Sequence, residues 1–71
     1  MPKLYSSDEI FKVLRKNNFN LISQKGSHGK FKNPSGRTVI LPMNKKEIPI
    51  GTFRNILKQA GLTLQQFTEN I

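Results

Sequence analysis

The stretch GSHGKFKNPSGRTVIL, residues 26–41, holds two β-prone runs separated by a turn. In the turn Asn33–Gly36, proline presets one backbone angle and glycine permits another. The run Thr38–Leu41 has the highest β propensity in the chain, and the proline directly after it ends a strand. We therefore predict two antiparallel strands, from about His28 to Asn33 and from Arg37 to Leu41.

A further strand precedes this pair. Phe19, Leu21 and Ser23 alternate with the residues between them, and this period of two indicates a half-buried strand. Consecutive strands with short connections pair as an antiparallel meander. The middle of the chain is therefore expected to form a three-stranded antiparallel sheet.

The helix before the sheet is indicated by a capping box, in which Ser6 is followed three residues later by Glu9. We expect this helix to run from about Ser7 to Asn17. Its core-facing stripe consists of Ile10, Val13 and Leu14.

The helix after the sheet has apolar residues at positions i, i+3, i+4 and i+7, which are Phe53, Ile56, Leu57 and Ala60. Gly61 is placed to end it. Beyond it, Thr63 and Gln66 form a second capping box. We therefore predict a short third helix, Leu64–Glu69, with Leu64 and Phe67 packing inward.

The order helix, three strands, helix predicts an α+β fold in which both helices cover one face of the sheet. The other face is left open. Phe31 is expected to point toward the helices, so the two-residue period places His28, Lys30 and Lys32 on the open face. One solvent-facing row then carries a titratable imidazole and two ammonium groups.

Length and composition exclude several classes of protein. At 71 residues the chain has room for one small domain, residues 1–71. It has no cysteine and one histidine, so we expect no disulfide framework, no metal site and no cofactor. No apolar run approaches the roughly 20 residues of a membrane span, and the N-terminus lacks the apolar stretch of a signal peptide. We expect a cytoplasmic protein that makes no membrane contact.

Positive charge is concentrated in the middle of the chain. Twelve Lys and Arg against four Asp and Glu give a net charge of +8, which indicates a polyanionic partner. No acidic residue lies between Phe19 and Lys46, whereas the basic residues there are Lys25, Lys30, Lys32, Arg37, Lys45 and Lys46. A single lysine would be explained by a solvated surface that only aids solubility. Six basic residues in a segment without acidic residues favour phosphate binding instead.

His28 lies among these cations. A neutral imidazole can take the proton from an RNA 2′-hydroxyl or give one to the leaving 5′-oxygen, and lysines offset charge on the phosphoryl oxygens. Gly26 and Gly29 would let an RNA backbone approach closely, and Ser27 can hydrogen-bond a phosphate. A lone histidine is more often an ordinary surface residue than a catalyst. One imidazole also cannot serve as both the general base and the general acid. Composition alone therefore favours RNA binding over cleavage, with a purely protein-binding domain as a third class.

Three strings together resemble the HicA family of bacterial and archaeal mRNA interferase toxins. They are QKGSH at residues 24–28 followed by Phe31, PSGR at 34–37, and GTFRNILKQAG at 51–61. The resemblance extends from Ser6 to Leu62 in motif order and spacing. By this resemblance, His28 matches the family's catalytic histidine. Many members carry a second histidine after the proline that ends the third strand, where this chain has Met43 and Asn44.

The resemblance implies a fold like a double-stranded-RNA-binding domain, translation-independent mRNA cleavage and neutralisation by a HicB antitoxin. We therefore expect a metal-independent endoribonuclease, with a non-catalytic basic RNA-binding module as the alternative. The expected RNA contacts are Lys25, Gly26, Ser27, Gly29, Lys30, Lys32, Arg37, Lys45 and Lys46. An acidic antitoxin would cover the open face by charge complementarity, and we expect DNA contacts only through that partner.

Overall fold

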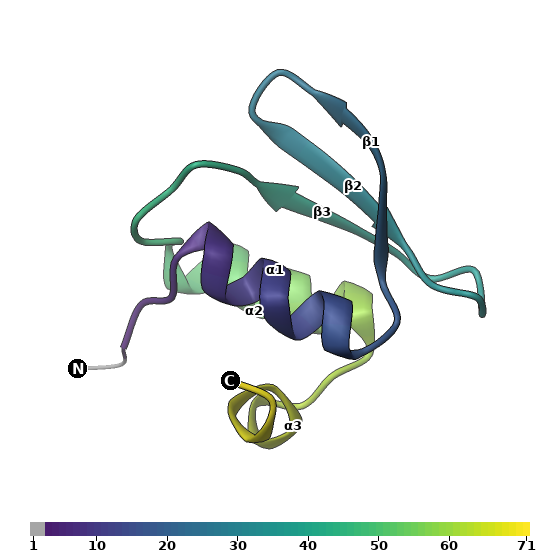
Figure 1. Cartoon of the computed structure of the whole chain (residues 1–71). Coiled ribbons are helices and arrows are strands. Elements are labelled where there is room, and N and C mark those ends of the chain that lie inside the picture. Colours follow the sequence, from purple (N-terminus) through teal and green to yellow (C-terminus); the bar gives the residue numbers. More distant parts are fainter. Residues whose placement is uncertain (1–2) are drawn as a thin grey trace.

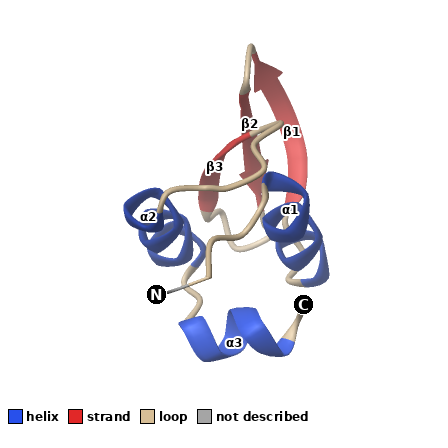
Figure 2. Ribbon diagram, turned by 90° about the vertical axis from the view of Figure 1, so that its left-hand side faces the viewer, coloured by secondary structure: helices blue, strands red, loops and turns tan. Residues whose placement is uncertain are grey.

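The structure, a computed structural model, describes residues 3–71. Its elements are α1 (Ser7–Lys16), β1 (Asn20–Lys25), β2 (His28–Lys32), β3 (Thr38–Pro42), α2 (Ile50–Ala60) and α3 (Leu64–Glu69). The strands form one antiparallel sheet in the order β1-β2-β3. α1 and α2 lie next to each other under the sheet, and α3 lies on their far side (Figures 1 and 2). This confirms the predicted α+β fold with its short extra helix.

Residues 1 and 2 belong to the N-terminal stretch expected to carry no signal peptide, and they lie outside the described part. Within residues 3–71, no helix has both the length and the apolar character needed to cross a membrane.

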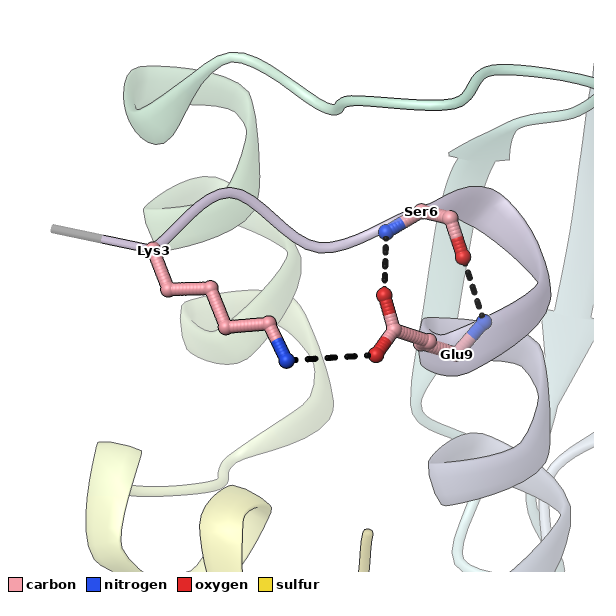
Figure 3. A network of polar contacts seen from close by, with 3 residues as sticks. All are labelled: Lys3, Ser6 and Glu9. Carbon is pink, nitrogen blue, oxygen red and sulfur yellow. Dashed lines mark hydrogen bonds and ion pairs between the residues drawn. The ribbon is translucent and has the colours of Figure 1, made fainter.

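Both predicted capping boxes are present. At the start of α1, the Ser6 backbone N–H donates to Glu9 Oε1 at 2.9 Å, and the Glu9 N–H donates to Ser6 Oγ at 3.1 Å. Lys3 Nζ lies 3.6 Å from the second carboxylate oxygen of Glu9 (Figure 3). Thr63 and Gln66 make the same reciprocal pair at the start of α3. Each box satisfies backbone donors that the first helical turn leaves free.

A left-handed residue follows each of the two longer helices, and after α2 it is the glycine predicted to end that helix. α1 ends at Lys16, Asn17 caps it, and Asn18 has a φ of +68°. α2 ends at Ala60, and Gly61, which caps it, has a φ of +72°. Asparagine and glycine tolerate this conformation better than other residues, and it turns the chain sharply out of each helix.

The core lies between the helices and one face of the sheet. Its buried apolar side chains form one cluster, consisting of Ile10, Val13, Leu14, Phe19, Phe31, Val39, Leu41, Ile48, Phe53, Ile56, Leu57, Ala60 and Phe67. From the sheet itself, β2 contributes Phe31 and β3 contributes Val39 and Leu41. Because these side chains alternate along their strands, the residues between them face away from the helices.

The inward packing predicted for α3 is half right. Phe67 is buried, and its ring centroid lies 4.8 Å from that of Tyr5 in an edge-to-face contact. Leu64, by contrast, is 56% exposed. It lines a hollow between α2 and α3 together with Tyr5 and Leu57. A helix this short buries one large side chain and leaves the first residue at the rim.

β1 is not the half-buried strand that its alternation predicts, because all its residues are exposed. The β1–β2 hairpin projects beyond the helices (Figures 1 and 2). The register also shifts: Leu21 pairs with Phe31, whereas Ser23 pairs with Lys30, so Ile22 is an extra residue in a β-bulge. The bulge resets the alternation and brings Ser23 to the same face as Lys30.

The α1 capping box predicts a pH-dependent stability. The hydrogen bond from the Ser6 backbone N–H, aided by the charge of Lys3, holds the pKa of Glu9 below its ordinary value of 4.5. Because folding lowers this pKa, the stabilisation is present above the unfolded-state value and is lost as the pH falls through the folded-state value. E9Q keeps an acceptor oxygen but removes the charge, so it should have a lower Tm than wild type at neutral pH. Circular dichroism melts should show this gap closing as the pH falls below the ordinary value of 4.5; a constant gap would contradict the assignment.

Candidate functional site

The open face of the sheet is built by the alternation of β2. Gly29 and Phe31 are buried, and His28, Lys30 and Lys32 are exposed. Paired residues on neighbouring strands share a face, so three rows cross the open face: Lys25–His28–Pro42, Ser23–Lys30–Ile40 and Asn20–Lys32–Thr38. His28, Lys30 and Lys32 therefore share the open face as predicted. Lys25 lies directly beside His28 on the neighbouring strand.

A two-residue turn, Gly26–Ser27, places His28 at the first position of β2. Gly26 has a φ of +58°, which a side chain would strain, and no atom lies within 4 Å of the position its Cβ would take. The Ser27 carbonyl accepts a hydrogen bond from the Met43 backbone N–H at 2.6 Å. The turn is thus fixed to the end of β3 while its glycine remains open to solvent.

Gly29 has a different environment from the one predicted. It lies on the buried side of β2, and a Cβ there would come within 3.1 Å of both Leu21 Cδ1 and Met43 Sδ. Glycine at this position is therefore explained by packing under the hairpin. The structure does not bring the side-chain position of Gly29 to the open face.

Two hollows flank His28. The first, which we call the α2 hollow, encloses about 290 Å³ between the sheet and α2 and is lined by His28, Ile40, Pro42, Thr52, Asn55 and Gln59. The second, the loop hollow, lies beside the connection from β3 to α2 and is lined by Ser27, His28, Pro42, Lys45, Glu47 and Thr52. The imidazole therefore lies where the two hollows meet.

The sequence did not reveal that α2 takes part in the site. Thr52, Asn55 and Gln59 follow at i, i+3 and i+7, which places them in one polar stripe beside the buried face of the helix. Gln59 Oε1 accepts a hydrogen bond from the Ile40 backbone N–H at 3.0 Å. This bond holds α2 along the free edge of β3, so the polar stripe borders the open face.

The β3–α2 connection is held against the start of α1. Ser7 is buried; its Oγ donates to the Pro42 carbonyl at 2.6 Å and accepts from the Lys45 N–H at 3.0 Å. Ile48 N–H donates to the Tyr5 carbonyl at 2.8 Å. These bonds position the loop that carries Lys45 and Lys46, both of which are exposed. Lys45 reaches the loop hollow, and Lys46 follows it on the surface.

One predicted cation lies elsewhere. Arg37 precedes β3, whereas His28 pairs with the last residue of that strand, so the two are roughly 16 Å apart along the sheet. Arg37 Nη1 donates to the Gln59 carbonyl at 3.3 Å, and its guanidinium lies against Gly61. Arg37 therefore caps the carboxyl end of α2, and the structure does not bring it to the imidazole.

The charges at the site are not neutralised from within the protein. Among the described residues, the ion pair is that of Lys3 with Glu9, which lies at the start of α1. Glu47, which directly follows the acid-free segment, is the one acidic residue that lines either hollow. The open face therefore offers its ammonium groups to an external anion.

Comparison with known protein families gives a match over most of the chain. The family model described as HicA toxin of bacterial toxin-antitoxin matches residues 7–62 of the chain, which spans α1, the sheet and α2 and leaves α3 outside. No curated protein sequence matches the chain significantly.

The placement of Lys30 and Arg37 predicts different effects on RNA binding. Lys30→Gln removes a cation from the open face, so the log–log salt dependence of affinity for single-stranded RNA should weaken by about 0.7. Arg37→Gln should leave that slope unchanged and cost about 1 kcal/mol of stability through the lost contact with α2. Fluorescence anisotropy with a cleavage-resistant 2′-O-methyl RNA, together with urea unfolding, measures both. Equal changes of slope in the two variants would contradict this map of the site.

Proposed function

The chain belongs to the HicA toxin family of bacterial toxin–antitoxin systems, and on that premise we propose that it is a metal-independent endoribonuclease that cleaves mRNA through His28. The observation that carries the proposal is the position of the imidazole. It lies on an open basic face, next to Lys25 and one row from Lys30, with a hollow on either side.

The reaction follows from groups that this face offers. The His28 imidazole accepts the proton of a 2′-hydroxyl, whose oxygen then bonds to the adjacent phosphorus while the bond from phosphorus to the 5′-oxygen breaks. The products are a 2′,3′-cyclic phosphate and a 5′-hydroxyl. Lys25 and Lys30 flank the place where the phosphoryl oxygens gain charge, so they favour the transition state over the ground state.

A second group must protonate the leaving 5′-oxygen if the imidazole is the base. Asn44 stands where many relatives carry another histidine, and an amide does not exchange protons in this pH range. Water has access through the loop hollow, and the Glu47 carboxylate lines the same hollow. A carboxylate only accepts hydrogen bonds, so we assign the second role to Lys30, another lysine of the site or water.

The alternative function is a non-catalytic RNA-binding module. It is supported by the same unpaired lysines and by the fact that the chain has one histidine. In that case the imidazole is one more contact for phosphate, and affinity depends on charge alone.

Substitution of His28 separates the two functions. His28→Ala should lower RNA cleavage at least about 100-fold, because general acid–base catalysis contributes that much or more. It should also relieve growth arrest while the purified protein still binds RNA. Lys12→Ala, on the exposed side of α1, is the control and should change neither RNA cleavage nor growth arrest. Undiminished cleavage by His28→Ala would exclude the assignment. Binding and toxicity that persist in His28→Ala but vanish in a Lys30→Glu, Lys32→Glu double variant would establish the alternative.

We further propose that a HicB-like antitoxin blocks the toxin by covering the open face. Acidic side chains of the partner would pair with Lys25, Lys30 and Lys32 and bury His28. RNA is then excluded directly, with no need for a change of shape elsewhere. DNA contacts of the complex are assigned to the antitoxin.

Chemical modification of the imidazole tests this occlusion. The chain has one histidine, so diethylpyrocarbonate labelling can be assigned to His28 by mass spectrometry. Labelling should proceed in the free toxin and fall at least about tenfold in the complex with a HicB-like antitoxin. Nuclease activity should fall in parallel. Unprotected His28 in a complex that is nevertheless inactive would show that inhibition acts at a distance from the site.

A further inference from the structure

The α2 hollow is lined by apolar and amide side chains, which a surface that binds only phosphate does not require. Its walls combine apolar side chains from β3 with the amide side chains of Asn55 and Gln59 from α2, and His28 also lines it. We propose that this hollow binds one unpaired nucleobase of the RNA substrate and that Asn55 reads its edge. The inference rests on the proposed function, since it concerns the nucleotide next to the phosphate at His28.

The size and apolar lining of the hollow suit a base. A volume of about 290 Å³ lies at the small end of ligand pockets and accommodates a single flat ring system. Ile40 is 40% exposed, and Pro42 lies beside it in the same hollow. A base that covers these side chains would remove their apolar surface from water.

The amide groups supply hydrogen bonds of the right kind. Asn55 is exposed, and its side chain makes no hydrogen bond to any other residue between positions 3 and 71. It can therefore offer one donor and one acceptor side by side, which is the pattern that a base edge matches. Gln59 has its oxygen engaged by the Ile40 N–H, so its NH₂ group remains available. No acidic residue lines this hollow.

The surroundings favour a single-stranded nucleic acid over a peptide. Lys30 pairs with Ile40 across the open face, so a phosphate that binds Lys30 lies within reach of a base on Ile40. An extended peptide that added to β3 would need the Ile40 N–H, and Gln59 already occupies it. In a duplex the base edges are paired, whereas an unpaired base can leave the strand and enter a pocket.

The test compares base preference in binding. The His28→Ala protein is titrated with oligoadenylate, oligocytidylate and oligouridylate of equal length, followed by fluorescence anisotropy. One base should bind about tenfold more tightly than the weakest, in keeping with one amide–base contact. Adding Asn55→Ala should reduce the ratio to less than about twofold while the affinity for the weakest oligomer stays unchanged.

Gln65→Ala is the matched control, because it removes an exposed helical amide on α3, away from the sheet. It should keep the full base preference. RNA binding with no base preference, or with a preference that Asn55→Ala leaves intact, would overturn the nucleobase site. The endoribonuclease proposal is judged separately by cleavage with the wild-type chain, so it survives that outcome. An absence of RNA binding would overturn both.

Discussion

Burial of Phe31 under α1 and α2 is the contact on which the site depends. Its ring is fully buried and meets Phe11 edge-to-face at 5.3 Å. Burying such a side chain contributes about 1.5–3 kcal/mol. A shift of β2 by one residue would expose Phe31 and turn His28, Lys30 and Lys32 inward, at a cost of several kcal/mol for each buried charge. Burial of the Phe31 ring and the cost of burying charged side chains therefore favour the same strand register. The position of the imidazole follows from this packing of the core.

Features that depend on neighbouring residues in the chain could be predicted. Both capping boxes, the apolar face of α2 and the burial of Phe31 each arise within a few turns of helix or one strand, where periodicity is informative. The bulge in β1 could not, because Ile22 suits either side of a strand and its displacement is defined only by pairing with β2. Leu64 was wrongly placed because its i, i+3 spacing with Phe67 indicates a shared side, whereas this six-residue helix buries only Phe67.

The candidate site was predicted where it lies on β2 and missed where it depends on tertiary contacts. Gln59 looks like any polar residue on the outer side of a helix, and its bond to Ile40 spans 19 positions of sequence. The polar stripe of α2 is visible as a spacing, but only the packing of α2 along β3 brings it to the imidazole. Arg37 shows the converse, since charge in the sequence does not reveal that its guanidinium contacts the end of α2, away from His28.

The charge of the open face links substrate binding to inhibition. Its lysines have no acidic partner within the described chain, so they repel one another in the free protein, and an external polyanion reduces that repulsion. RNA and an acidic antitoxin would both gain from the same lysines, and each would exclude the other by occupying them. A partner that binds the folded state also stabilises it by mass action. Under the proposed function, a basic site without ion pairs among the described residues would thus give the toxin affinity for RNA and, by the same charges, make it susceptible to an acidic inhibitor.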